Sequence, residues 1–106
     1  MLIGREYTVD YTTQNLPNLS GSDLIQIRLS RDGGDTWSII ISSQINTGTF
    51  DWEVSGPITV MAQFEISAID NLSGLRDPDR SFTGDLFSIT GAAAQIKSKA
   101  RFSYKF

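Results

Sequence analysis

Alternation of apolar and polar residues is the dominant pattern along this chain. Near the N-terminus, Tyr7, Val9 and Tyr11 alternate with polar residues, and the segments 24–30 and 49–54 repeat the pattern. Successive side chains of a β-strand point to opposite faces of the sheet, so a period of two predicts strands with one buried face. The predicted strands are residues 5–12, 24–30, 36–42, 49–54, 60–69, 86–90 and 96–106.

Segments rich in glycine, proline, asparagine and aspartate separate these strands. They are residues 15–23, 31–35, 55–57 and 70–85, and their composition is typical of turns and loops. Strand starts recur every ten to fifteen residues, and no stretch of ten or more residues has a convincing period of 3.6. We therefore predict an all-β antiparallel sandwich over residues 1–91, followed by a strand-like C-terminal arm over residues 92–106.

The inward positions of the predicted strands define the expected core. We expect it to contain Tyr7, Val9, Ile25, Ile27, Leu29, Trp52, Phe64, Ile66, Phe87 and Ile89. On the strand 60–69, Val60 is expected on the inner face and Ile69 on the outer face.

Three segments resemble immunoglobulin-like and fibronectin-III-like modules of extracellular and surface-assembly proteins. They are I-Q-I-R-L-S-R-D-G-G-D-T-W from residue 25, N-T-G-T-F-D-W-E-V from residue 46 and D-L-F-S-I from residue 85. The resemblance implies a sandwich of that family over roughly residues 5–90 and says more about fold than about function. The first strand of the family has no counterpart before Tyr7, so we expect a vacant sheet edge.

Residues 30–37 also fit the Asp-box pattern S-x-D-x-G-x-T-W of sialidase-like propellers. The matching residues are Ser30, Asp32, Gly34, Thr36 and Trp37, and we predict a structural turn in which Asp32 caps main-chain N–H groups. A propeller needs several blades of about 40–45 residues each, so one box in 106 residues does not predict a sialidase.

The composition excludes several chemistries. The chain contains no cysteine and no histidine, which rules out disulfides, thiolate nucleophiles and Ser–His–Asp triads. The carboxylates Asp51 and Glu53 flank Trp52 on the outer face of a predicted strand, where a solvated sheet face explains them. We predict a protein that is not an enzyme and has no cofactor. No apolar run reaches the roughly 20 residues that span a membrane, and no signal peptide is visible.

One loop offers candidate metal ligands. Asp70, Asp77 and Asp79 are oxygen donors of the kind that Ca²⁺ prefers. Their spacing is not that of an EF-hand, and Arg76 and Arg80 lie among them. We therefore expect the loop to satisfy these carboxylates itself and predict no bound metal.

Charge is distributed unevenly. Residues 1–95 carry a net charge of −7, whereas residues 96–106 carry +4. Apolar and cationic residues alternate in the arm, which is typical of an amphipathic strand and not of a flexible nucleic-acid-binding arm. We predict that the arm pairs with a sheet edge of its own or a neighbouring domain; the alternative is an arm laid on the surface and ordered only by lattice contacts. The interacting residues would be Lys97, Lys99, Arg101, Phe102, Tyr104 and Phe106.

These observations predict a non-catalytic structural or assembly module. It would be an accessory or decoration-type component of a larger particle such as a phage virion, located on the virion or another extracellular surface. Its partners would be copies of itself or another coat or scaffold protein, with no direct nucleic-acid or membrane partner. The alternative is a carbohydrate- or protein-binding module of a secreted enzyme or adhesin. An exposed aromatic groove, with Trp37 as its most plausible member, would favour that alternative.

Overall fold

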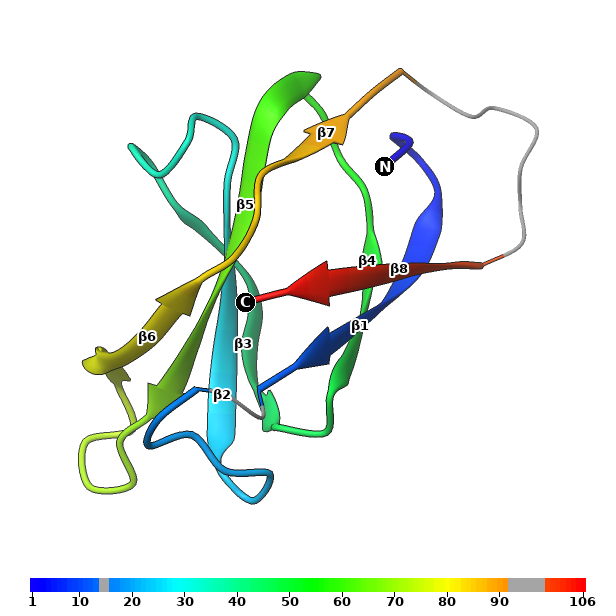
Figure 1. Cartoon of the computed structure of the whole chain (residues 1–106). Coiled ribbons are helices and arrows are strands. Elements are labelled where there is room, and N and C mark those ends of the chain that lie inside the picture. The colour runs from blue at the N-terminus through cyan, green and yellow to red at the C-terminus, as the bar shows by residue number, and fades with distance from the viewer. Residues whose placement is uncertain (14–15, 92–98) are drawn as a thin grey trace.

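The computed structural model describes residues 1–13, 16–91 and 99–106. These residues form strands, turns and loops and contain no helix. The strands are β1 (Glu6–Thr12), β2 (Leu24–Ser30), β3 (Ser38–Ile45), β4 (Thr49–Glu53), β5 (Thr59–Ile69), β6 (Arg76–Thr83), β7 (Phe87–Ile89) and β8 (Ala100–Lys105) (Figure 1).

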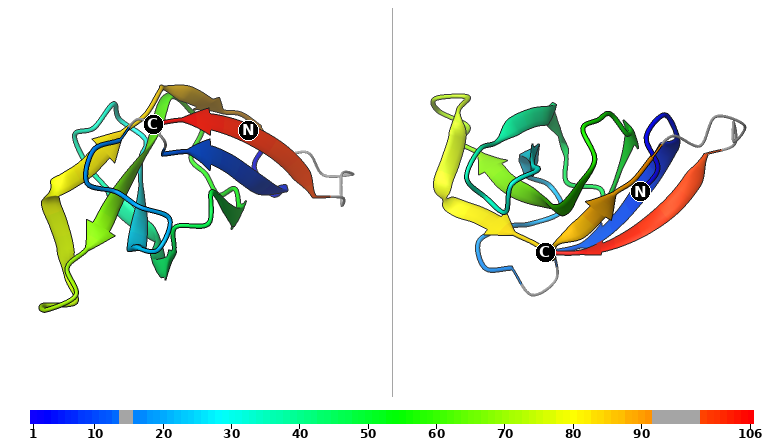
Figure 2. Two further views of the ribbon diagram at one scale, coloured as in Figure 1. Left: turned by 60° about the horizontal axis from the view of Figure 1, so that its bottom comes forward. Right: turned by 90° about the horizontal axis from the view of Figure 1, so that it is seen from above.

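The strands form two sheets that pack against each other (Figures 1 and 2). One sheet has the order β4-β1-β8, and the other has the order β3-β2-β5-β6, with β7 also paired to β5. This β-sandwich confirms the predicted fold class. Every named pair is antiparallel except β1–β8, which is parallel. A parallel pair needs a long connection, and β1 and β8 lie at opposite ends of the sequence.

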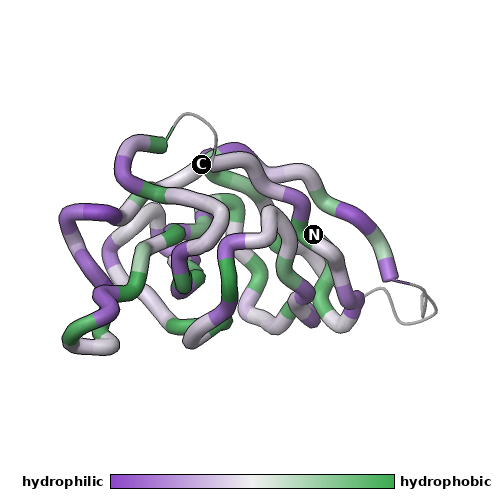
Figure 3. The backbone as a smooth tube through the Cα atoms, turned by 90° about the horizontal axis from the view of Figure 1, so that it is seen from below, coloured by the Kyte–Doolittle hydropathy of each residue, from purple (hydrophilic) through white to green (hydrophobic). Residues whose placement is uncertain are grey.

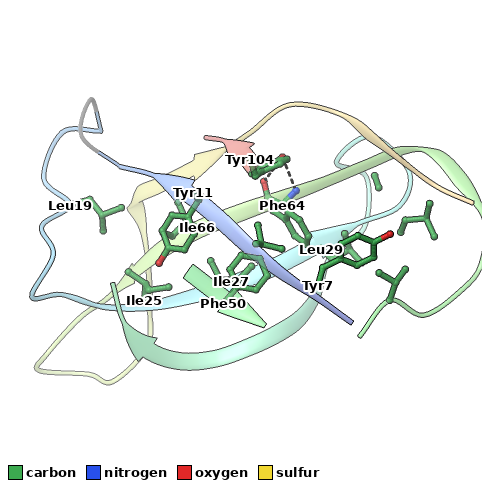
Figure 4. Packing of buried hydrophobic residues seen from close by; sticks show 14 of the residues in the cluster. Tyr7, Tyr11, Leu19, Ile25, Ile27, Leu29, Phe50, Phe64, Ile66 and Tyr104 are labelled. Atoms are coloured by element: carbon green, nitrogen blue, oxygen red, sulfur yellow. Dashed lines mark hydrogen bonds between the residues drawn. The ribbon is translucent and has the colours of Figure 1, made fainter. Parts of the chain in front are cut away.

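The core lies between the sheets and is rich in aromatic rings (Figure 4). Phe64 on β5 is fully buried at its centre. Its ring centroid lies 5.3 Å from that of Phe50, 4.9 Å from that of Phe87 and 5.0 Å from that of Tyr104. These rings belong to β4, β7 and β8, so one side chain ties together segments that are far apart in the sequence.

Eight of the ten predicted core residues are buried, and Trp52 and Phe87 are only half-buried. Trp52 lies on β4, at an edge of the smaller sheet, and Phe87 lines an open pocket beside β8. Both side chains still pack against the core cluster. Hydrophilic and hydrophobic stretches are interspersed along the chain in Figure 3, and buried and more exposed residues alternate along β1 and most of β2, as the period of two predicts.

The predicted faces of β5 are wrong at both ends of that strand. Val60 is exposed, although its parity placed it inward, and Ile69 is buried. The pairing of β5 with β7 shifts register between Thr59 and Ala62, and its pairing with β6 shifts between Ser67 and Ile69. Burial therefore stops following the alternation at both ends of β5, since Met61 beside Val60 is also exposed and Ala68 beside Ile69 is also buried, and no local pattern announces this.

The segment 70–85 is not a continuous loop as predicted. Residues Arg76–Thr83 form β6, which pairs with β5 and places Phe82 opposite Ile66. Pro78 lacks an N–H group, but β6 is an edge strand and can accommodate it. The turn-like composition of this segment therefore reflects an edge position.

Two predicted strand boundaries also move. β3 runs from Ser38 to Ile45, later than the predicted 36–42, and its pairing with β2 contains register shifts. The strand predicted over 96–106 is observed as β8, while residues 96–98 lie outside the described part of the chain.

Candidate interaction surface

The turn between β2 and β3 is held by the side chains predicted for it. Ser30 Oγ donates to Asp32 Oδ1 (2.7 Å) and accepts the N–H of Gly34 (2.8 Å). Thr36 donates to Asp32 through its hydroxyl (2.5 Å) and its N–H (2.9 Å). These bonds, the Thr36 hydroxyl first among them, lower the pKa of Asp32 to about 2. The carboxylate is thus occupied within the turn.

The Trp37 side chain also makes its contacts within the same region of the chain. Its indole N–H donates to the carbonyl of Gly34 (3.1 Å), and the guanidinium of Arg28 lies 5.2 Å from the ring centroid. The ring therefore already has a cationic partner from β2. This leaves less of the ring available for stacking on a sugar than the carbohydrate-binding alternative requires.

A buried carboxylate on the outer face of the larger sheet was not predicted. Glu65 on β5 accepts hydrogen bonds from Arg28 Nε (2.8 Å) and Arg76 Nε (3.1 Å). Arg28 and Glu65 are direct partners in the β2–β5 register. The sequence does place opposite charges at outward positions of the strands that become β2 and β5. This ion pair could be predicted only once these two strands were known to be neighbours.

Two of the three carboxylates considered as metal ligands, those of Asp70 and Asp77, accept hydrogen bonds from the chain itself, whereas the exposed Asp79 carboxylate has no partner among the described residues. Asp70 accepts the N–H of Leu72 (2.9 Å), and Asp77 accepts the N–H of Asp79 (2.9 Å) and the Nε of Arg80 (3.1 Å). Within the described residues, no three acidic side chains come together in a way that could hold a metal ion.

Three aromatic side chains of β8 and of the residue after it pack against the rest of the same chain. Phe102 packs edge-on against Tyr7 (centroids 6.4 Å apart), and Phe106 packs edge-on against Tyr11 (5.6 Å). Tyr104 is buried and lies against the Phe64 ring (5.0 Å). The predicted anchors of the arm thus contact β1 and β5 of the same chain.

The hydroxyl of Tyr104 connects β8 to the opposite sheet. It donates to the carbonyl of Asp85 (2.6 Å) and accepts the N–H of Phe64 (3.0 Å), as the dashed lines in Figure 4 indicate for the Phe64 contact. Burial raises the pKa of Tyr104 well above its usual value. Gly84 permits the approach, because a Cβ atom there would overlap the Tyr104 ring and lie 2.5 Å from the carbonyl oxygen of Lys105.

The outward side chains of the smaller sheet form what we call the charged face. It consists of Glu6, Asp10, Asp51, Glu53, Lys99, Arg101 and Lys105. The acidic residues come from β1 and β4, and the cations come from β8 and the residue before it.

Ion pairs cross the charged face. Lys99 Nζ lies 3.1 Å from Asp51 and 3.6 Å from Glu6, and Arg101 lies 3.1 Å from Asp10. A bond from the Thr8 hydroxyl and then the contact with Lys99 lower the pKa of Asp51, while the bond to Asp51 raises the pKa of Lys99. These pairs are exposed, so they set orientation more than stability. Lys97, also predicted to interact, lies outside the described residues.

Each outer strand of the smaller sheet borders an open pocket. The pocket beside β8 has a volume of about 410 Å³ and lies between residues 85–87 and 102–105, with Thr12 at its rim. The pocket beside β4 has a volume of about 350 Å³ and is lined by residues of β3, of β4 and of the turn between them.

Exposed aliphatic side chains were the other feature that the sequence did not predict. Ile58 and Val60 are 64% and 74% exposed, and Leu72 and Leu75 are 98% and 68% exposed. The first pair lies at the start of β5 and the second in the loop that follows it. The sequence signal for the second pair is the presence of two leucines in a loop that is otherwise polar and contains glycine, which indicates leucine side chains outside the core.

Comparison of the chain with protein-family models, with curated proteins and with solved structures gave no significant match. Within the described part of the chain, no helix has the length and hydrophobicity needed to cross a membrane.

Proposed function

We propose that this protein is a non-catalytic structural module that assembles with other protein chains. In this proposal it is an accessory or decoration-type component of a larger particle such as a virion, and its partners are copies of itself or another coat or scaffold protein. The resemblance to modules of surface-assembly proteins supports a position on a virion or another extracellular surface.

The observation that carries the proposal is the exposure of aliphatic side chains at both ends of β5. Ile58 and Val60 lie at one end, and Leu72 and Leu75 lie just beyond the other. A strand of eleven residues is about 36 Å long, and the longest dimension of the molecule is 44 Å. Exposed apolar patches mark protein contact sites, so this module is suited to joining neighbours at its two ends.

Native mass spectrometry of the full chain, isolated under non-denaturing conditions from its source, tests this proposal. We expect a complex of defined stoichiometry. Replacing Leu72 and Leu75 together by serine should reduce the recovered complex at least about tenfold without lowering the melting temperature, because exposed side chains contribute little to folding.

Ile39→Ser on β3 is the matched control, since Ile39 is exposed but lies away from both ends of β5. This variant should assemble like the wild type. A free monomer at native abundance, or a complex that tolerates the serine pair, would contradict the proposed function.

A further inference from the structure

The two outer strands of the smaller sheet carry opposite charges on the same face. Among the described residues, β4 and β8 each pair with β1 on one side only. The outward residues of β4 include Asp51 and Glu53, and those of β8 include Arg101 and Lys105. We propose that β4 of one copy pairs with β8 of a second copy, so that the smaller sheets continue from copy to copy. This inference rests on the proposed function and identifies its partner as a second copy of the chain.

The main chain of β4 is oriented to receive such a partner. Gly48 and Val54 flank β4 on its two sides. The carbonyl of Gly48 accepts the N–H of Tyr11 on β1 (2.9 Å), and the N–H of Val54 donates to the carbonyl of Arg5, just before β1 (3.1 Å). In an antiparallel ladder every second residue bonds to the same neighbour. The main-chain groups of Thr49, Asp51 and Glu53 therefore point away from β1, toward the open edge.

The main chain of β8 is oriented in the same way. The carbonyl of Lys105 accepts the N–H of Asp85 (3.2 Å), which lies on the side away from β1. Residues two and four positions earlier in a strand have the same orientation, so the N–H and C=O groups of Ser103 and Arg101 also face the open side. Both edges thus present main-chain donors and acceptors, which is the requirement for adding a strand.

Strand direction and register agree with the charges. β4 is antiparallel to β1 and β8 is parallel to it, so β4 is antiparallel to the β8 of a copy that turns the same face outward. Placing Asp51 opposite Ser103 brings Glu53 opposite Arg101. The same register puts Trp52 opposite Phe102 on the inner face, which favours aromatic contact beside the charge pair.

Unmatched charge on the charged face favours the contact. Glu53 lies directly across from Glu6 in the β1–β4 register, and within the described residues it has no ion-pair partner. The side chain of Arg101 is 69% exposed and contacts Asp10 through Nη1 alone. The remaining guanidinium nitrogens are open to a second carboxylate, which Glu53 of the next copy supplies.

Part of each edge is already covered by the same chain. On β8 the N–H of Asp85 occupies the carbonyl of Lys105, so the main-chain groups of Arg101 and Ser103 are the ones left for a partner. The pockets of about 410 Å³ and about 350 Å³ lie beside β8 and β4. The side-chain amide of Gln44 donates to the carbonyl of Thr49 (2.7 Å) and covers the start of β4. Asp51 and Glu53 are farther along the strand, so the pairing begins there. Because the two surfaces differ, the contact is heterologous and produces a ring or a filament.

Charge exchange in the full-length protein tests the inference. Sedimentation equilibrium at low salt should show self-association of the wild type that weakens as salt rises. Glu53→Lys and Arg101→Glu should each weaken it about tenfold or more, because each places like charges opposite each other. The double variant should return to within about threefold of the wild type, because it restores opposite charges in reversed order.

Two further variants separate this contact from general electrostatics and from misfolding. Asp79→Lys reverses an exposed charge on β6, in the other sheet, and should leave association unchanged. Ser103→Pro removes one edge N–H and should abolish association, while thermal unfolding reports whether each variant is folded.

The outcomes distinguish the inference from the proposed function. If the purified chain stays monomeric, or if the double variant fails to recover while both single variants fold, the β4–β8 contact is wrong. A native complex held through Leu72 and Leu75 would still support the proposed function in that case. Absence of any native complex would overturn the proposed function itself.

Discussion

Single residues of this protein act over very different distances along the chain. The bonds to Asp32 come from residues two and four positions away, so the turn at 30–37 is organised by its own sequence. Phe64 instead contacts rings from β4, β7 and β8, and its burial depends on the assembled sandwich. Substituting Asp32 should therefore change the pH dependence of stability, whereas substituting Phe64 should lower the stability of the whole fold.

The pH dependence of the melting temperature should report on the hydrogen bonds of Asp32 in the turn. The pKa of Asp32 is about 2 in the folded protein, below its ordinary value of 3.8. A depressed pKa stabilises the fold above the ordinary value, and this contribution is lost as pH falls from about 4 to about 2. In Asp32→Asn, the melting temperature should therefore fall less steeply over that range than in the wild type. Asp79→Asn, whose exposed carboxylate has no partner in the described residues, is the control and should retain the wild-type slope.

Truncating the central ring should have a large effect. Phe64→Ala removes a fully buried side chain and leaves a cavity, so we expect the free energy of unfolding to fall by about 3–5 kcal/mol. Urea denaturation measures this free energy of unfolding. The control is Ile39→Ala at an exposed position, which should cost about 0.5 kcal/mol or less. Trp52→Ala should cost less than Phe64→Ala, because Trp52 is only half-buried. Equal losses at Phe64 and Ile39 would contradict the assigned core.

Among the elements, β8 depends most on distant contacts. It pairs in parallel with β1, at the opposite end of the sequence. Its Tyr104 hydroxyl bonds to Phe64 in the other sheet and to Asp85 in the loop between β6 and β7. Gly84 is the point at which the chain makes room for it. A change there should therefore loosen β8 before it unfolds the rest of the sandwich.

Gly84→Ala should expose β8 to solvent. The added methyl group would overlap Tyr104 and approach the Lys105 carbonyl, where main-chain atoms leave little room to adjust. Hydrogen exchange followed by mass spectrometry should show faster exchange across residues 100–105. Gly91→Ala, at a position with no atom within 4 Å of the added group, should leave exchange unchanged. Unaltered protection of β8 in Gly84→Ala would contradict the predicted clash.

The sandwich as a whole uses β8 to cover part of its core. Tyr104 belongs to the buried cluster, and the half-buried Phe102 and Phe106 pack against it. Full burial of such a side chain contributes about 1.5–3 kcal/mol and half-burial less, so together they supply a large part of the roughly 5–15 kcal/mol that stabilises a domain. The C-terminal strand is therefore part of the folding unit in this structure.

Deleting residues 99–106 should leave a chain that is unfolded or barely folded at 25 °C. Circular dichroism and thermal unfolding would measure the loss. The control is the full-length Lys99→Gln/Arg101→Gln variant, which removes the exposed ion pairs but keeps the aromatic anchors, and it should unfold near the wild-type temperature. A truncated chain as stable as the full-length protein would exclude this role for β8.

The sequence by itself determined the all-β class, the faces of β1, β2 and β4, and the hydrogen bonding of the turn at 30–37. Each of these depends on side-chain alternation or on bonds between near neighbours, which are local properties of the chain.

The tertiary structure alone decided the partner of β8, the strand at 76–83, the exposure of Val60 and the burial of Glu65. Strand partners are chosen by competition among surfaces far apart in sequence, and burial departs from the alternation at both ends of β5 without a local signal. The charge alternation of the arm predicted an edge-seeking strand, but only its pairing with β1 in the folded structure shows which edge it occupies.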